Sequence, residues 1–293
     1  MQRKHFIKSL LSLTAMTTLG SFKNFTDTLS TQGEIMPVLF VGHGSPMNAI
    51  EDNEFTRGWK AIVQDLPTPK AILCISAHWE TKGTFVTAMQ HPKIIHDFGG
   101  FPQALFDIEY NALGSPWLAN ETQQHITTTA IGLDEAWGLD HGSWSVLKQL
   151  YPAANIPVVQ LSLDYTKDAQ YHYNLAQELA GLRKKGVLII GSGNMVHNFS
   201  YAQLRGDFNA HFGHDWALEA NETFKKLITQ NDVKSLVNYQ QYSKALQLSA
   251  PSPDHYLPML YAMALRNKNE NVSYFNDAVV GGSFSMTSFK ISS

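Results

Sequence analysis

The chain has 293 residues, of which 44% are hydrophobic and 16% charged, and its formal net charge is −3. This profile is typical of a globular protein with a sizeable core, and the slight negative charge argues against a general attraction to nucleic acid or to anionic membranes. Cys74 is the single cysteine, which excludes an internal disulfide and a zinc site built on thiolates. The twelve histidines are more informative, because neutral imidazole is the commonest metal ligand.

Residues 1–35 differ in composition from the rest of the chain. Arg3, Lys4 and Lys8 make a basic start, and an apolar stretch of about ten residues follows from Leu10. This layout is typical of an export signal and loosely resembles the twin-arginine type, with lysine in place of the second arginine. The alternative is a disordered or loosely docked extension. A cytoplasmic location is favoured, with export to the periplasm as the alternative, and no later segment is long and apolar enough to cross a membrane.

Residues 36–293 contain no linker, charge block or repeat, which favours a single domain. Four apolar runs rich in Val and Ile lack the alternation of a half-exposed strand and predict strands buried on both faces: 37–42, 71–76, 156–163 and 186–191. Segments with helical spacing lie between and after them: 55–66, 171–182 and 212–227. The predicted fold is therefore α/β, with a central, mostly parallel (mixed) sheet flanked by helices.

Two further regions depart from this alternation of strands and helices. Gly281 and Gly282 separate two segments of strand-like composition and predict an antiparallel C-terminal hairpin made of edge strands. The stretch 79–155 is rich in aromatic residues, Gly and Pro. We expect it to form loops and short helices over the ends of the sheet, where such segments form the walls of pockets.

Three histidines follow predicted strands. His43 follows the first, His78 the second and His197 the fourth. Ligands of an open α/β sheet bind at the carboxyl ends of its strands, so these histidines are candidates for a shared metal site. The alternative is that each is an ordinary hydrogen-bonded histidine, since strand order cannot be read from these patterns.

Two more histidines are candidates. Residues 252–254 make a plausible helix start, which would put His255 in the first turn, pointing back toward the sheet. His141 lies in a loop just before a possible helix. The remaining histidines are expected in the leader, on the surface or in packing roles: His5, His91, His96, His125, His172, His211 and His214.

Other chemistries find no support in the sequence. It contains no G-x-S-x-G, no G-x-x-x-x-G-K-[ST] and no H-E-x-x-H pattern, and Cys74 lies in the middle of a predicted strand. Metal chemistry on histidines remains, and three or four imidazoles without a thiolate suit Zn²⁺, Fe²⁺ or a similar divalent ion.

Six sequence blocks carry a specific resemblance. In chain order they are LFVGHGSPMNAI, ISAHWET, HDFGGFPQALF, LDHGSW, GSGNMVHN and SPDHYLPML. Their order and approximate spacing over residues 36–290 resemble the class III (LigB-type) extradiol ring-cleavage dioxygenases, in particular the 4,5-DOPA extradiol dioxygenase group.

The resemblance implies a role for each candidate residue. His43, His78 and His255 would be metal ligands, and His197 a fourth ligand or the nearby acid/base. His141 would contact dioxygen or substrate. Residues of the third block would line the entrance and grip the substrate ring: Asp97, Phe98 and Phe101. The protocatechuate enzymes of the class have glutamate where this chain has His255, so the native metal stays open between Zn²⁺ and Fe²⁺, with Fe²⁺ expected for ring cleavage.

The implied function is a metal-dependent dioxygenase of aromatic compound metabolism that opens a DOPA-like catechol with O₂. No nucleic-acid partner or integral membrane segment is expected, and a monomer is favoured. A zinc-dependent hydrolase and a metal-binding protein of the same fold without turnover are the alternatives.

Overall fold

The computed structural model describes residues 35–203 and 208–293. The predicted leader lies outside the described residues except for Ile35. Within the described ranges, no helix combines the length and the apolar character needed to cross a membrane.

A mixed sheet of eight strands forms the centre of the structure, in the order β4-β3-β5-β2-β6-β1-β10-β7. The two strands outside this sheet, β8 and β9, form a separate antiparallel hairpin. The strands are β1 (Val38–Gly42), β2 (Ala71–Thr81), β3 (Thr84–Thr87), β4 (Ile131–Asp134), β5 (Val158–Asp164), β6 (Val187–Gly193), β7 (Asn271–Phe275), β8 (Val279–Val280), β9 (Phe284–Ser285) and β10 (Ser288–Ser292).

The four strands predicted from the apolar runs form the parallel centre of this sheet. β5, β2, β6 and β1 lie next to one another in this order and are parallel; the parallel direction was predicted from the sequence, whereas the order was not. Alternate residues of a strand point to opposite faces, and in β1 both sets are apolar. In β1, Val38 and Phe40 belong to the hydrophobic cluster on one face, and Leu39 and Val41 to the cluster on the other. Burial on both faces explains why these strands show no alternation in the sequence.

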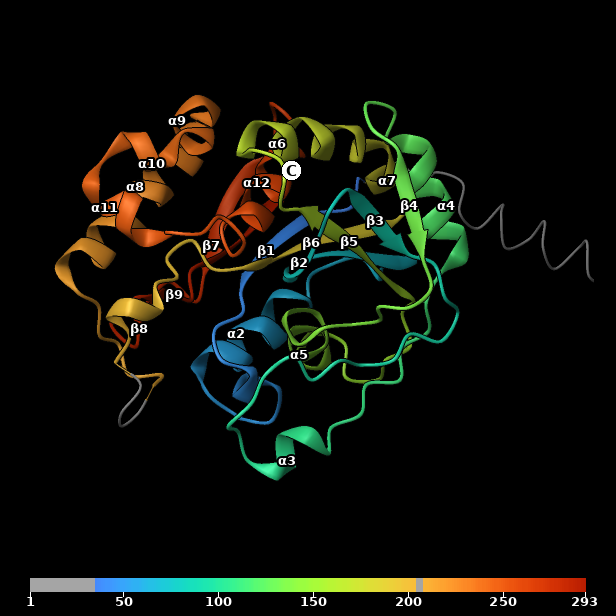
Figure 1. Cartoon of the computed structure of the whole chain (residues 1–293), viewed down its shortest axis with the longest axis horizontal. Coiled ribbons are helices and arrows are strands. Elements are labelled where there is room, and N and C mark those ends of the chain that lie inside the picture. The colour runs from blue at the N-terminus through green and yellow to red at the C-terminus, as the bar shows by residue number, and fades with distance from the viewer. Residues whose placement is uncertain (1–34, 204–207) are drawn as a thin grey trace, which may run out of the picture.

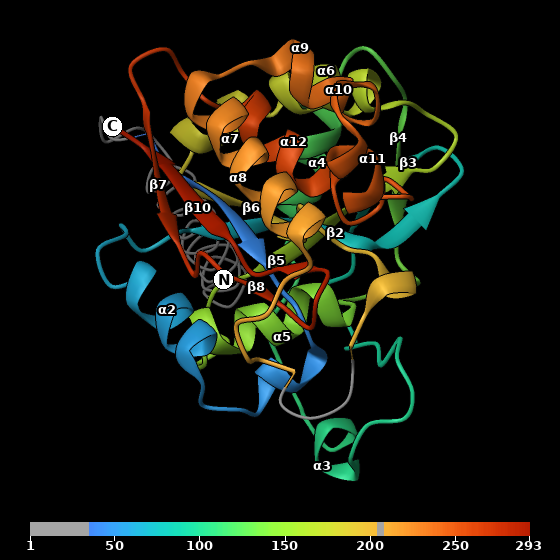
Figure 2. The same ribbon diagram turned by 90° about the vertical axis from the view of Figure 1, so that its left-hand side faces the viewer.

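Helices cover both faces of the sheet (Figure 1). α6, α7 and α12 lie on one face, and α2 and α5 on the other; the view in Figure 2 shows α8 on the same side as α12. The α-helices are α2 (Glu54–Ile62), α3 (Gln103–Phe106), α4 (Pro116–His125), α5 (His141–Leu150), α6 (Ala169–Glu178), α7 (Ala180–Lys184), α8 (Asp215–Gln230), α9 (Val233–Val237), α10 (Tyr239–Tyr242), α11 (Lys244–Ser249) and α12 (Leu257–Ala264); η1 (Pro46–Ala49) and η2 (Phe199–Tyr201) are 3₁₀ helices.

The sequence prediction was wrong in two details of the sheet. The region 79–155 contributes two strands, β3 and β4, besides its loops and helices; each has only four residues, too few to produce a periodic signal. β10 is not an edge strand, because it pairs with β1 on one side and β7 on the other, and only β7 lies at the edge. The predicted antiparallel C-terminal hairpin at Gly281 and Gly282 is confirmed; it consists of β8 and β9, which come between β7 and β10 in the chain.

Candidate active site

His43 directly follows β1 and is held there by its backbone and its ring. Its amide donates to the carbonyl of Gly193 at the end of β6, and its Nδ1 lies 3.0 Å from Ser192 Oγ. Ser192 Oγ donates its own proton to the carbonyl of Gly142 and therefore accepts from His43. His43 consequently carries its proton on Nδ1, which leaves the lone pair on Nε2.

The glycines on either side of His43 are both required by the structure. A Cβ on Gly42 would lie 2.7 Å from the backbone of Met286, and Gly44 has a φ of +61°. A larger residue at either position would move the loop that carries His43.

His78 lies inside β2, whereas the sequence predicted that it follows the strand. β2 continues to Thr81, but its register with β5 shifts between Ile75 and Glu80. This irregularity places His78 beyond the part of β2 that pairs with β6. A Cβ on Gly142 would lie 2.7 Å from His78 Cδ2, so a glycine at the start of α5 makes room for the ring.

His141 is the first residue of α5, and Asp140 caps the helix by accepting from the Ser143 amide. The carboxylate of Asp97 binds His141 twice: Oδ1 accepts from the backbone amide and Oδ2 from Nδ1, each at 2.9 Å. Asp97 Oδ2 also lies 3.4 Å from Nδ1 of His78. Burial acts to raise the pKa of Asp97, but the hydrogen bonds from His141 outweigh it and hold this pKa below its ordinary value.

His255 lies in the turn before α12, whereas the sequence predicted that it belongs to the first turn of that helix. The helix begins at Leu257, two residues later. The turn is tied to the end of β6, because the His255 carbonyl accepts from the Asn194 amide at 2.8 Å. Its Nδ1 donates to the carboxylate of Asp254, so its lone pair, like that of His43, is on Nε2.

His197 follows β6, as predicted, and its ring stacks on that of His255. The centroids are 3.5 Å apart and the planes differ by 6°. Its backbone amide donates to the Ser249 carbonyl. Within the described part of the chain, no hydrogen bond is seen between its ring nitrogens and another residue, which leaves the ring available to a ligand.

The five predicted histidines come together in one cluster. Ring centroids are 5.0 Å apart for His43 and His78, 4.9 Å for His78 and His255, and 3.9 Å for His78 and His141. Candidate ligand atoms lie within 4.8 Å of one another in each of two groups, one made of His43, His78 and His141 and the other of His197, Asp254 and His255.

The geometry of His43 and His78 fits a divalent metal ion. Their Nε2 atoms are 3.2 Å apart. Two nitrogens at about 2.0–2.1 Å from one ion at tetrahedral angles are separated by roughly 3.3–3.4 Å. The lone pair of His43 Nε2 points toward His78, whose Nδ1 lies 3.4 Å from Asp97 Oδ2, so both Nε2 atoms are placed to share one cation.

Burial keeps these imidazoles neutral, which is the form that binds metal. Burial, followed by the proximity of the other histidines, lowers the pKa of His43 and His255 well below the ordinary value. Burial also lowers the pKa of His78 to about 3 and that of His197 to about 4.

The cluster lines a cavity of about 600 Å³. Its walls carry an aromatic group that comes from separate segments of the chain: Phe98, Phe101, Phe199, Phe208 and Phe284. Phe98 contacts the His141 ring edge-on, with centroids 5.5 Å apart. The cavity therefore has an apolar part that suits a planar ring and, next to it, a set of histidine nitrogens that can bind a metal.

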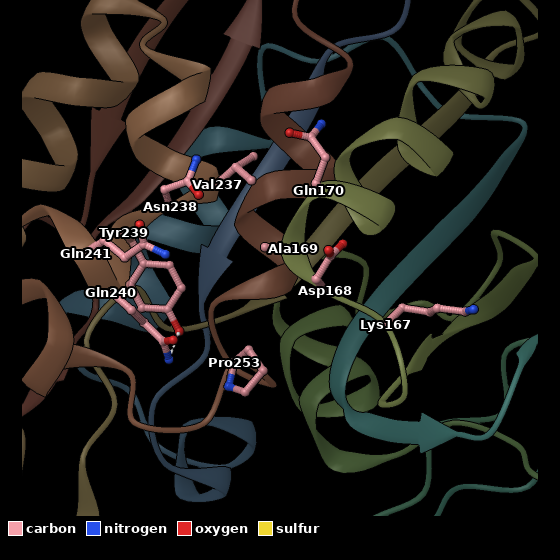
Figure 3. A pocket seen from close by; sticks show the side chains of 10 residues that line it. All are labelled: Lys167, Asp168, Ala169, Gln170, Val237, Asn238, Tyr239, Gln240, Gln241 and Pro253. Carbon is pink, nitrogen blue, oxygen red and sulfur yellow. Dashed lines mark hydrogen bonds between the residues drawn. The ribbon is translucent and has the colours of Figure 1, made fainter.

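A second cavity of about 610 Å³ lies between α6 and the α9–α10 segment (Figure 3). Most of its lining side chains are polar, and Figure 3 shows Asn238, Gln240 and Gln241 on one side of it and Lys167 and Asp168 on the other. It contains no histidine among its lining residues, so the aromatic cavity is the candidate active site.

Three residues that support the histidines were not among the predicted site residues. Ser192, Asp140 and Asp254 orient or adjoin the histidines but are ordinary serine and aspartate positions in the sequence. For Asp140 and Asp254, the position directly before a candidate histidine was the available signal. For Ser192 there was none, since its contact with His43 joins residues far apart in the chain.

Comparisons with known proteins agree with this geometry. Residues 37–282 match the family model of the catalytic LigB subunit of aromatic ring-opening dioxygenase. A protein of Escherichia coli K12 named 4,5-DOPA dioxygenase extradiol is 46% identical over 87% of this chain and 94% of its own length. The protein of the same name from Beta vulgaris is 35% identical over 90% of this chain and 100% of its own.

A solved structure is also similar. The crystal structure of an uncharacterized protein from Escherichia coli K12 has a TM-score of 0.76 and 40% identity, covering 87% of this chain and 99% of that one. The prediction of a ring-cleaving extradiol dioxygenase is confirmed at the level of the family and the reaction class. The chain belongs to the LigB family of aromatic ring-opening dioxygenases.

Proposed function

We propose that the chain is an Fe²⁺-dependent extradiol dioxygenase that opens a catechol with a DOPA-like side chain. The observation that carries the proposal is the set of five histidines at one aromatic-walled cavity. The names of the relatives from Escherichia coli and Beta vulgaris support the substrate class.

His43, His78 and His255 are the residues we assign to hold the metal. Their Nδ1 atoms face Ser192, Asp97 and Asp254, which orients the three rings. Bound Fe²⁺ would supply Lewis acidity toward the catechol hydroxyls and the electron path between ring and O₂.

His197 and His141 are the residues we assign to the chemistry beside the metal. His197 lines the cavity with free ring nitrogens and is suited to accept a proton from a catechol hydroxyl, or else to serve as a fourth ligand. His141 has its proton on Nδ1 and its lone pair on Nε2, and is placed to hydrogen-bond to the substrate or to oxygen. Phe98 and Phe101 would pack against the substrate ring.

The test is anaerobic loading with Fe²⁺ followed by a panel of catechols, DOPA included, and air. We expect oxygen consumption and a yellow ring-opened product, both lost in His197→Ala. His125→Ala, a substitution on α4 far from the cavity lining, is the matched control and retains activity.

Two results would contradict the proposal. The first is protein that holds stoichiometric metal but consumes no oxygen with any catechol, which would contradict the proposed dioxygenase activity. Ester or amide hydrolysis by the zinc-loaded protein, without oxygen uptake by the iron-loaded one, would favour a hydrolase.

A further inference from the structure

Asp97 contacts two histidines of the cluster at once. One oxygen binds the backbone amide of His141, while the other binds its Nδ1 and approaches Nδ1 of His78. The sequence pattern assigned Asp97 to the substrate, but both of its oxygens are already engaged by His141. The contacts favour a role that acts through the histidines.

The loop that carries Asp97 is fastened to the segment that precedes α5. Ile95 donates to the carbonyl of Leu139, and Leu139 donates to the carbonyl of Lys93. The indole of Trp144 in α5 donates to the carbonyl of Ile95 at 2.9 Å. The distance between Asp97 and His141 is therefore fixed by backbone on both sides.

We propose that Asp97 is a positioning residue that holds His141 with its proton on Nδ1 and its lone pair on Nε2. A carboxylate only accepts hydrogen bonds, so it selects this tautomer and no other. The expected effect on turnover rests on the proposed function, in which His141 contacts the substrate or oxygen in the cavity. The assignment of the tautomer does not depend on that function.

Asp97→Asn is the decisive variant, because it changes the hydrogen bonding with little change of shape. The amide oxygen must accept from the His141 backbone amide, since an amide group there would set two donors against each other. The amide nitrogen then faces Nδ1 and donates to it, which moves the ring proton to Nε2. We expect kcat to fall by about 100-fold or more, with KM changed by less than about threefold.

The direct readout is the ¹⁵N NMR spectrum of the imidazoles in zinc-loaded protein, with His141 assigned by its loss in His141→Gln. The wild type is expected to show His141 protonated at Nδ1 and Asp97→Asn to show it protonated at Nε2. Circular dichroism and metal content check that the variant folds and binds zinc. Asp107→Asn is the matched control, because this exposed carboxylate accepts a hydrogen bond from Gln103 and does not line the cavity.

Several outcomes would overturn the proposal. An NMR spectrum that shows wild-type His141 protonated at Nε2 would overturn it, even if the variant fails to fold. An unchanged His141 tautomer or an unchanged kcat in Asp97→Asn would also overturn it. A raised KM with normal kcat would instead support the earlier expectation that Asp97 contacts the substrate. If no catechol is oxidised by the wild type, the proposed function fails while the NMR result still decides the tautomer.

Discussion

His43 and Ser192 form a hydrogen bond of 3.0 Å between the ends of two adjacent parallel strands. The Ser192 hydroxyl also donates a hydrogen bond to the carbonyl of Gly142 in α5. The hydroxyl thus fixes the tautomer of His43 and also ties its ring to the helix that begins with His141.

Ser192→Ala should weaken metal binding by about 10-fold to 100-fold, because His43 loses the acceptor that orients it. Competition with a chelator for Zn²⁺ or Co²⁺ measures the change. Ser162→Ala is the matched control, since this buried strand serine bonds Thr81 and Phe85 and no histidine. Equal affinity in the wild type and Ser192→Ala would contradict the assigned role.

Gly142→Ala should displace His78. The added methyl would lie 2.7 Å from His78 Cδ2 and closer still to Ser76 Oγ. We expect a loss of about 1–3 kcal/mol in the free energy of unfolding, together with weaker metal binding. Gly99→Ala is the control, because no atom lies within 4 Å of its added Cβ. Denaturant titration and metal analysis give the two readouts, and a fully stable, metal-replete Gly142→Ala would contradict the argument.

His172 should make stability depend on pH in mildly acidic solution. The ring is fully buried between the Tyr261 hydroxyl and the Asp164 carbonyl. Burial lowers its pKa to about 4, although Asp164 and Asp168 act in the opposite direction. Below pH 6.5 the unfolded chain binds a proton that the folded state excludes, so the stabilisation present at pH 7 is lost as pH falls toward 4, by up to about 3 kcal/mol.

His172→Gln removes this dependence. The variant should be less stable than the wild type at pH 7, and the difference in the free energy of unfolding should shrink toward pH 4.5. His91→Gln, at an exposed position, is the control. A difference that stays constant from pH 7 to pH 4.5 would show that His172 does not titrate differently in the two states.

Arg183 and Glu270 form a buried ion pair whose removal should be costly. Arg183 is 1% exposed and also donates to the carbonyls of Met36 and Leu265. Glu270→Ala leaves this charge without its partner, and we expect a loss of about 3–5 kcal/mol by chemical denaturation. The double variant Arg183→Met with Glu270→Leu should recover most of the loss. A double variant no more stable than Glu270→Ala would contradict this account.

The sheet centre and the candidate histidines could be predicted because their signals are local. β1 and β6 are continuous apolar runs, and His43 and His197 follow them directly. The same reasoning failed for His78, because an irregularity inside β2 leaves no trace in composition.

Strand order and the supporting contacts could not be predicted, because they join distant residues. The position of β10 between β1 and β7 depends on how the chain returns after more than 200 residues. The bond between Asp97 and His141 likewise spans 44 residues. Each depends on the assembled fold, which no short window of sequence specifies.

The five histidines lie on five separate segments: after β1, within β2, at the start of α5, after β6 and before α12. No fragment of the chain that lacks β1 or the turn before α12 carries the whole cluster. An ion held there would act as a non-covalent cross-link among segments up to 212 residues apart, from His43 to His255. Its binding free energy would then add to the cooperativity of the entire fold, so that loss of the ion would weaken the molecule far from the cavity itself.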